Sequence, residues 1–380
     1  MGAEVLPLLI AAVTGRALAA SAARAGYPVI VLDCFADRDT ALVARACRPV
    51  ATGDAPRLDQ RLLLDAARQL APPERSSGLI YGSGFEGRTG LLARLARGRR
   101  LFGNPPQVIE AVRDPARVFP LFERIGVPYP EVRFTRPPER AGWLVKHPGG
   151  AGGARVWRAD AGSARGGAYF QRFEPGQAHS ALFLADGRRA EVVGFNALWT
   201  GSRRQDRPFL YGGAIGPVPL PPAVESAVRG RLDSLVRATG LVGLNGLDFL
   251  LVGEDWKALE VNPRPTATID LYDPDYPDGL LALHLRATQG ELPARRRRSA
   301  TVRGHAVVQA PVGGVFRPSF ELPEWCRDIP RAGVRFRIGD PVCTVHAEAR
   351  DPAAARQQVH ERQRMVERLL TDAAANPAMT

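Results

Sequence analysis

Short apolar runs alternate with amphipathic stretches over the first hundred residues of the chain. The runs at 6–13, 28–32 and 77–81 are nearly continuous, as in strands that are buried on both faces of a sheet. Residues 17–25 and 62–70, which lie between them, place apolar side chains at helical spacing. Parallel strands joined by helices give this rhythm, so the pattern predicts a doubly wound parallel sheet.

The pattern changes after Gly103, where the expected elements become a mixture of helices and antiparallel strands. A hairpin is predicted around Gly253, because two apolar strands flank a short polar turn there. Helices are expected over 107–112, 115–125, 223–239 and 352–370, and strands over 143–146, 168–173, 180–184, 244–251, 257–261 and within 301–345.

Composition and charge exclude several classes of protein. The chain has 380 residues and a net charge of +12, but its only lysines are Lys146 and Lys257, and the arginines are spread along the sequence. We therefore expect no nucleic acid partner. The run at 295–298 is expected to be a solvated linker or an anion contact. No apolar stretch is long enough to cross a membrane, and four cysteines without a C-x-x-C pair indicate a cytoplasmic protein with reduced thiols.

A glycine-rich loop follows the predicted strand at 143–146. Glycines after a strand expose backbone N–H groups that can hold phosphate, and Lys146 stands directly before Gly149–Gly153. A lysine kept in a chain that otherwise uses arginine indicates a need for a compact charge. The loop itself is equally typical of a nucleotide clamp and of a flexible turn.

The predicted hairpin carries the second set of polar residues. Glu260, Asn262 and Arg264 share one face because side chains alternate along a strand, and Asp248 lies on the partner strand. Two carboxylates and an amide oxygen form a hard oxygen site for Mg²⁺. The alternative is a half-exposed sheet whose polar residues face solvent.

A third motif, Gly82-x-Gly84-x-x-Gly87, is weaker. It matches the residue pattern of a dinucleotide-binding loop. However, it follows a later strand instead of the first strand of the sheet, and no acidic residue stands about 20 positions after it. We favour a tight strand-to-helix turn in which Glu86 faces a ligand.

Taken together, these residues resemble the ATP-grasp superfamily. The resemblance rests on Lys146 before the glycine loop, Gln171 in YFQRF, Asp248 in GLDF, and Glu260-x-Asn262-x-Arg264. It implies three units: an N-terminal doubly wound domain over 1–105, an ATP-grasp domain of two α+β subdomains over 106–297, and a small β-rich C-terminal subdomain with a final helix over 298–380.

The resemblance also implies a role for each site residue. Lys146 would contact the α- and β-phosphates, and the glycine loop would be a lid over them. Lys146 and Arg264 would be the catalytic residues, and Arg264 would stabilise the acyl-phosphate. Asp248, Glu260 and Asn262 would hold Mg²⁺. The residues assigned to ATP are Lys146, Gly149, Gly150, Gly152, Gly153, Gln171, Phe173 and Glu174.

The activity that the resemblance implies is an ADP-forming ligase. ATP would activate a small-molecule carboxylate as an acyl-phosphate, which an amine would then attack, and the product would belong to cofactor biosynthesis linked to one-carbon metabolism. Whether the protein forms a homodimer is left open by the resemblance. Two alternatives remain: a biotin-dependent carboxylase-like enzyme, and a non-catalytic nucleotide-binding regulatory protein.

Two departures from the family pattern bear on this choice. Family members carry a second ATP lysine where this chain has Pro115, so Arg113 or Arg117 would have to replace it. Biotin carboxylases continue after the Glu-x-Asn-x-Arg motif with a glutamate base, where this chain has Thr266-Ala267-Thr268. A threonine cannot act as a base near neutral pH without an activating neighbour, which favours the amide ligase.

Two further expectations concern charged residues near these motifs. Four aspartates between Asp270 and Asp278 are expected to form either a solvated loop or a contact to an amine substrate. Lys257 follows a hairpin turn and is expected to be solvated.

Overall fold

The computed structural model describes residues 5–52, 56–160, 166–204, 206–293, 301–317 and 320–375, so the arginine run at 295–298 lies outside the described residues. The first unit is a five-stranded parallel sheet in the order β3-β2-β1-β4-β5, as the sequence predicts. Its strands are β1 (Leu8–Ala11), β2 (Val29–Asp33), β3 (Ala46–Pro49), β4 (Gly78–Tyr81) and β5 (Leu101–Phe102). Its helices are α1 (Arg16–Arg24), α2 (Arg38–Val43), α3 (Gln60–Leu70) and α4 (Thr89–Ala96).

Alternate residues of these strands are buried on opposite faces of the sheet. Leu9 and Leu79 pack with α3 and α4, whereas Ile10 and Ile80 pack with α1 and with α8 (Gly279–Ala287). Helix α8 comes from much later in the chain. The N-terminal sheet is therefore closed on one face by the rest of the molecule, and the two parts share one core.

The second unit is an eight-stranded sheet in the order β14-β13-β10-β11-β12-β15-β19-β17. Its last three strands come from the C-terminal tail, so the β-rich tail extends the central sheet. The strands are β10 (Gln177–Asp186), β11 (Ala190–Thr200), β12 (Tyr211–Gly216), β13 (Val242–Val252), β14 (Asp255–Asn262), β15 (Val302–Gln309), β17 (Cys326–Arg327) and β19 (Pro341–Ala349).

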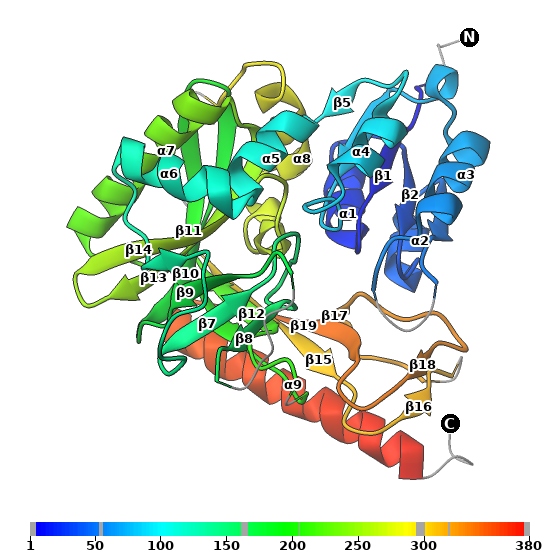
Figure 1. Ribbon diagram of the computed structural model, residues 1–380. Coiled ribbons are helices and arrows are strands. Elements are labelled where there is room, and N and C mark those ends of the chain that lie inside the picture. The colour runs from blue at the N-terminus through cyan, green and yellow to red at the C-terminus, as the bar shows by residue number, and fades with distance from the viewer. Residues whose placement is uncertain are drawn as a thin grey trace.

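The two faces of this sheet differ in what covers them. Phe183 of β10 packs under α6 (Pro115–Ile125) and α7 (Pro222–Thr239). Leu182, its neighbour, points to the opposite face, where it joins α8 and the N-terminal sheet. Figure 1 shows the N-terminal unit in blue and cyan beside the green strands of this sheet.

A smaller four-stranded sheet in the order β6-β9-β7-β8 lies between α6 and β10 in the chain. Its strands are β6 (Val132–Arg133), β7 (Trp143–Lys146), β8 (Val156–Arg158) and β9 (Tyr169–Arg172). Four buried side chains form a core of its own: Trp143, Val145, Ala159 and Phe170. The glycine loop connects β7 to β8, and α5 (Pro106–Arg113) precedes α6.

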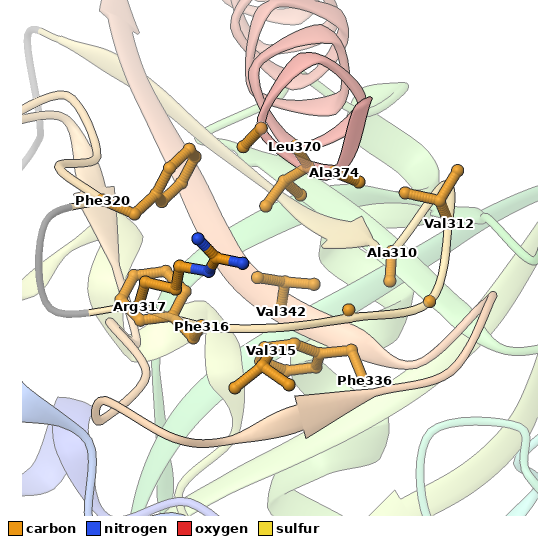
Figure 2. Close-up of a pocket in the computed structure, with 13 residues that line it drawn as sticks. Ala310, Val312, Val315, Phe316, Arg317, Phe320, Phe336, Val342, Leu370 and Ala374 are labelled. Carbon is orange, nitrogen blue, oxygen red and sulfur yellow. The ribbon is translucent and has the colours of Figure 1, made fainter. Parts of the chain in front are cut away.

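The final helix, α9 (Pro352–Ala375), covers the outer face of β15 and β19 through residues such as Val359 and Val366. Near its end, a cavity of about 200 Å³ lies between α9 and the pair β16 (Gly314–Val315) and β18 (Arg335–Phe336). Figure 2 shows that its labelled lining is apolar except for Arg317. It contains none of the residues that the sequence assigns to a site. Within the described residues, no helix is both long and apolar enough to span a membrane.

The junction between the two large sheets predicts a strong stability effect at Asn104. Its buried side chain donates to Asn245 Oδ1 (2.8 Å) and to the Pro263 carbonyl (3.0 Å), and it accepts from the Val242 N–H (2.8 Å). Asn104→Ala leaves Asn245 Oδ1 and the Val242 N–H unpaired, at about 1–3 kcal/mol for each buried group. The Pro263 carbonyl keeps its bond from the Tyr81 hydroxyl. We expect a loss of about 3 kcal/mol or more, measured by urea unfolding.

The control for this prediction is Gln69→Ala. Gln69 accepts a hydrogen bond from Arg48 on the exposed surface, so its loss should change stability by less than about 0.5 kcal/mol. Equal unfolding midpoints for the two variants would show that Asn104 does not join the sheets.

Candidate active site

The hairpin of β13 and β14 places Asp248 directly opposite Glu260, as the sequence predicts. Asn262 donates from Nδ2 to Asp248 Oδ2 at 3.0 Å and accepts at Oδ1 from Arg264 at 3.3 Å. The same face continues onto β10 and β11, where Ser180 stands opposite Asp248. The three predicted metal ligands therefore lie together on one face of the large sheet.

The electrostatics of this group favour a cation. Burial and the neighbouring Glu260 carboxylate raise the pKa of Asp248 to about 7. Two carboxylates and an amide oxygen are the donor set that Mg²⁺ takes in proteins, so the residues fit such an ion. Among the described residues, no group of three or more His, Cys, Asp or Glu side chains could hold a metal, so any ion here would depend on the amide of Asn262 as well.

Lys146 ends strand β7 and faces the same group. Burial lowers its pKa, and the carboxylates of Glu260 and Asp248 oppose that effect. Its ammonium makes no hydrogen bond or ion pair with a described residue. A partly buried lysine without a bound partner fits an anionic ligand such as a phosphate.

Arg113 is the residue that the sequence left undecided. Its side chain, the last of α5, is 7% exposed; it pairs with Glu260 at 3.0 Å and donates to the carbonyls of Gly150 and Val261. Arg117 points elsewhere: it is 54% exposed and lies 3.9 Å from Glu110. Of the two arginines considered as replacements for the missing lysine, Arg113 alone lies beside the predicted metal ligands Asp248, Glu260 and Asn262, called the metal group below.

The glycine loop lies against the N-terminal unit. A Cβ on Gly87 would lie 2.9 Å from the Cα of Gly149, so the two backbones touch. Gly153 has φ +74°, and a Cβ there would lie 1.8 Å from the carbonyl oxygen of Phe209. Only glycine allows these approaches, which explains the composition of the loop without assuming that it is merely flexible.

Arg264 forms a buried ion pair between the two large sheets. Its Nε donates to Glu86 Oε1 at 2.6 Å, and both side chains are buried. Burial by itself would raise the pKa of Glu86, but Arg264 and Arg113 outweigh it and hold the pKa below its usual value. The predicted turn after β4 thus directs Glu86 to the proposed catalytic arginine.

The residues assigned to the adenosine end of ATP differ in whether they already have partners in the structure. Gln171 is buried, and neither of its amide atoms has a partner among the described residues, which fits a hydrogen-bonding ligand. Phe173 stacks under Arg158, whose Cζ lies 4.2 Å from the ring centroid. Glu174 pairs with Lys257 at 2.6 Å. The expectation that Lys257 is solvated is therefore wrong, because the strand pairing brings it to a carboxylate.

Three of the four aspartates after Arg264 are neither in a solvated loop nor free to hold an amine, and the fourth, Asp278, is exposed. Asp270 forms two bonds to Arg16, and Asp273 pairs with Arg24 at 3.1 Å. Asp275 pairs with Arg303 at 2.9 Å. These carboxylates join the loop to α1 and β15. The sequence showed the aspartates, but their arginine partners lie up to 254 residues away.

Comparison with known protein families agrees with this geometry. Residues 114–268, which include β7, the glycine loop and the β13–β14 hairpin, match the family described as ATP-grasp domain. The chain contains an ATP-grasp domain. The predicted resemblance is confirmed, and with it the mixed α/β architecture.

Three similar proteins illustrate the range of this fold. The large chain of carbamoyl phosphate synthase from Thermus thermophilus is 27% identical over 241 residues, which are 55% of this chain but only 22% of that protein. The biotin carboxylase domain dimer of Hydrogenobacter thermophilus 2-oxoglutarate carboxylase, solved with MgADP and bicarbonate, has a TM-score of 0.71 at 14% identity, over 94% of this chain and 90% of that one. An L-amino acid ligase from Bacillus licheniformis has a TM-score of 0.68 at 15% identity, over 94% and 97%. The two structures show the shared fold.

The buried ion pair predicts a pH-dependent stability. A carboxyl group with a lowered pKa stabilises the fold above its unfolded value of about 4.5 and loses that contribution as the pH falls through the folded value. Glu86→Gln should remove this dependence. It should also cost about 3–5 kcal/mol at pH 7, because it leaves Arg264 buried without a counterion.

Unfolding midpoints between pH 3 and 7 test this expectation. Asp65→Asn is the control, since Asp65 pairs with Arg61 and Arg68 on the surface of α3, where ion pairs contribute little. If Glu86→Gln shifts the midpoint no more than this control, the pair does not hold the sheets together.

Proposed function

We propose that this protein is an ATP-dependent carboxylate–amine ligase that forms ADP and needs Mg²⁺. The observation that supports it best is the convergence of Lys146, Arg113 and Arg264 on the carboxylates of Asp248 and Glu260. Three cations around an oxygen-donor group suit a reaction in which phosphates and a developing oxyanion must be neutralised.

The residues divide the work by position. Lys146 and Arg113 would hold the phosphates of ATP under the glycine loop, while Gln171 would bond the base. Asp248, Glu260 and Asn262 would hold Mg²⁺, which when bound neutralises the phosphates and orients them. Arg264, which Glu86 holds at the end of the hairpin, would stabilise the acyl-phosphate and the tetrahedral adduct that follows from amine attack.

The same fold serves carboxylation in the similar 2-oxoglutarate carboxylase domain, so a carboxylase-like activity is the second candidate. One contact opposes it. Where biotin carboxylases carry a glutamate base, Thr266 and Thr268 bond to each other through their hydroxyls at 2.8 Å. Neither of these hydroxyls bonds to a described carboxylate or imidazole that could activate it.

The deciding experiment measures ADP release by the purified protein with MgATP. One arm supplies panels of carboxylates paired with amines, and the other supplies bicarbonate with free biotin. We expect turnover that needs both a carboxylate and an amine. Robust biotin-dependent turnover supports the carboxylase, and ATP binding without turnover in either arm supports a regulatory protein.

Glu260→Gln tests the metal assignment. The substitution replaces a charged oxygen ligand by a neutral one, so we expect ADP formation to fall by about 100-fold or more at every Mg²⁺ concentration. Glu254→Gln, in the exposed turn of the same hairpin, is the matched control. Turnover within a factor of two of the unchanged protein would refute the assignment.

Arg113→Met tests the replacement of the missing lysine. A charge-assisted hydrogen bond contributes about 1.5–3 kcal/mol, so ATP affinity should fall roughly 10- to 100-fold, as it should for Lys146→Ala. Arg117→Met should leave the affinity unchanged. Calorimetric titration with a non-hydrolysable ATP analogue measures all three, and circular dichroism checks that each variant is folded. Equal effects at Arg113 and Arg117 would rule out this role for Arg113.

A further inference from the structure

The polar face of the large sheet continues beyond the metal group to a buried pair of histidines. His305 on β15 stands directly opposite His346 on β19, with ring centroids 5.6 Å apart. Both point away from α9, whose core contacts come from the alternate residues Ala306 and Val345. Neither histidine takes part in the binding of ATP proposed above.

Tyr211 connects this pair to the glycine loop. Its hydroxyl lies 2.6 Å from His305 Nε2, and its backbone N–H donates to the Gly152 carbonyl at 3.0 Å. Burial and the carboxylate of Asp248 raise the pKa of Tyr211, so the hydroxyl lies within electrostatic reach of the metal group and stays protonated. The tyrosine thus stands between the lid and an imidazole.

The far side of the histidine pair, the array of Arg16, Asp270, Asp328 and Thr344, holds two carboxylates that favour an imidazolium and one arginine that opposes it. Thr344 donates to Asp328 Oδ2 at 2.6 Å and lies 3.2 Å from His346 Nε2. Arg16 binds both oxygens of Asp270 and contacts Asp328 at 3.2 Å. The array therefore has more carboxylates than arginines behind its two histidines.

Only one of the two ring nitrogens of His305 has a hydrogen-bond partner among the described residues. Its Nδ1 is buried and has no hydrogen-bond partner among the described residues. Burial lowers the pKa of His305, and Asp270 opposes that effect, so the ring is neutral at pH 7 and able to accept a proton. The charged or titratable groups that face it are Tyr211 from β12, His346 from β19, Asp270 from the loop after Arg264, Arg16 from α1, and Asp328 from the segment after β17.

We propose that Tyr211 and His305 accept the proton of the attacking amine, a role that rests on the ligase function proposed above. The amine nitrogen bonds to the acyl carbon, and the bond from that carbon to the phosphate oxygen breaks, so phosphate leaves with the electron pair. The proton on nitrogen passes to the Tyr211 oxygen as the tyrosine proton passes to His305 Nε2. Tyr211 touches the substrate, and His305 acts through it.

The geometry also explains how the chain manages without a base after the Glu-x-Asn-x-Arg motif. The hydroxyls of Thr266 and Thr268 bond only to each other in the described structure, whereas the Tyr211 hydroxyl has an imidazole at hydrogen-bond distance. A tyrosine coupled to a neutral histidine can transfer a proton near neutral pH, which a lone hydroxyl cannot.

The test separates the two halves of the reaction. Positional isotope exchange in ATP with the carboxylate alone reports formation of the acyl-phosphate, and ADP release with the amine present reports the complete reaction. We expect Tyr211→Phe and His305→Asn to keep isotope exchange within about threefold while amine-dependent turnover falls about 100-fold or more. The matched controls, Tyr27→Phe and His360→Asn, should change neither.

A pH profile adds a readout that a structural role would not move. Amine-dependent turnover of the unchanged protein should fall as the pH drops through the lowered pKa of His305, and this acid limb should be absent in His305→Asn. Equal losses in both half-reactions, or no loss in either, overturn the assignment of Tyr211 and His305. No isotope exchange with any carboxylate in the unchanged protein would instead overturn the ligase function, and this inference with it.

Discussion

The buried ion pair of Glu86 and Arg264 is the contact on which the rest of the site depends. Each charge would be costly to bury alone, so the two fix the N-terminal sheet against the end of the β13–β14 hairpin. Their other bonds are satisfied as well: Glu86 accepts from the Gly84 N–H, and Arg264 donates to Pro265 and Asn262. An arginine held from both sides is preorganised, which suits the role proposed for Arg264 in stabilising charge that develops during the reaction.

The polar residues of the candidate site are aligned because they lie on one face of the eight-stranded sheet. The face toward α6 and α7 is apolar, and the opposite face holds Glu260, Asp248 and Ser180 across adjacent strands. Because the C-terminal strands extend this sheet, the same face reaches His305 without a break in the hydrogen-bonded ladder. One continuous surface thus spans the metal group and the proposed proton acceptor, which independent subdomains could not guarantee.

Local patterns in the sequence predicted the parallel sheet, α6, β7 and the β13–β14 hairpin, because each has either a continuous apolar run or apolar residues at a regular spacing. Strand β12 was missed, since its sequence, YGGAIG, has three glycines and little strand character. Strand β11 was missed too; its Gly194 makes room for the ring of Tyr272. Contacts between residues far apart in the sequence could not be predicted. Glu86 and Arg264 are 178 positions apart, and no local pattern links Tyr211 to His305.

The separate core of the small sheet has a mechanical consequence. Parting the N-terminal sheet from the large one would uncover the leucines of α8 and break the pairs of Arg16 and Arg264. Tilting the small sheet outward would break the bonds of its glycine loop to Arg113 and Tyr211 and the contacts of Tyr169 and Trp157 with the large unit. It would leave the four-residue core of the small sheet intact. Among the described elements, the small sheet can therefore change its tilt without losing its own core, and under the proposed function such a change would open the side of the site assigned to ATP.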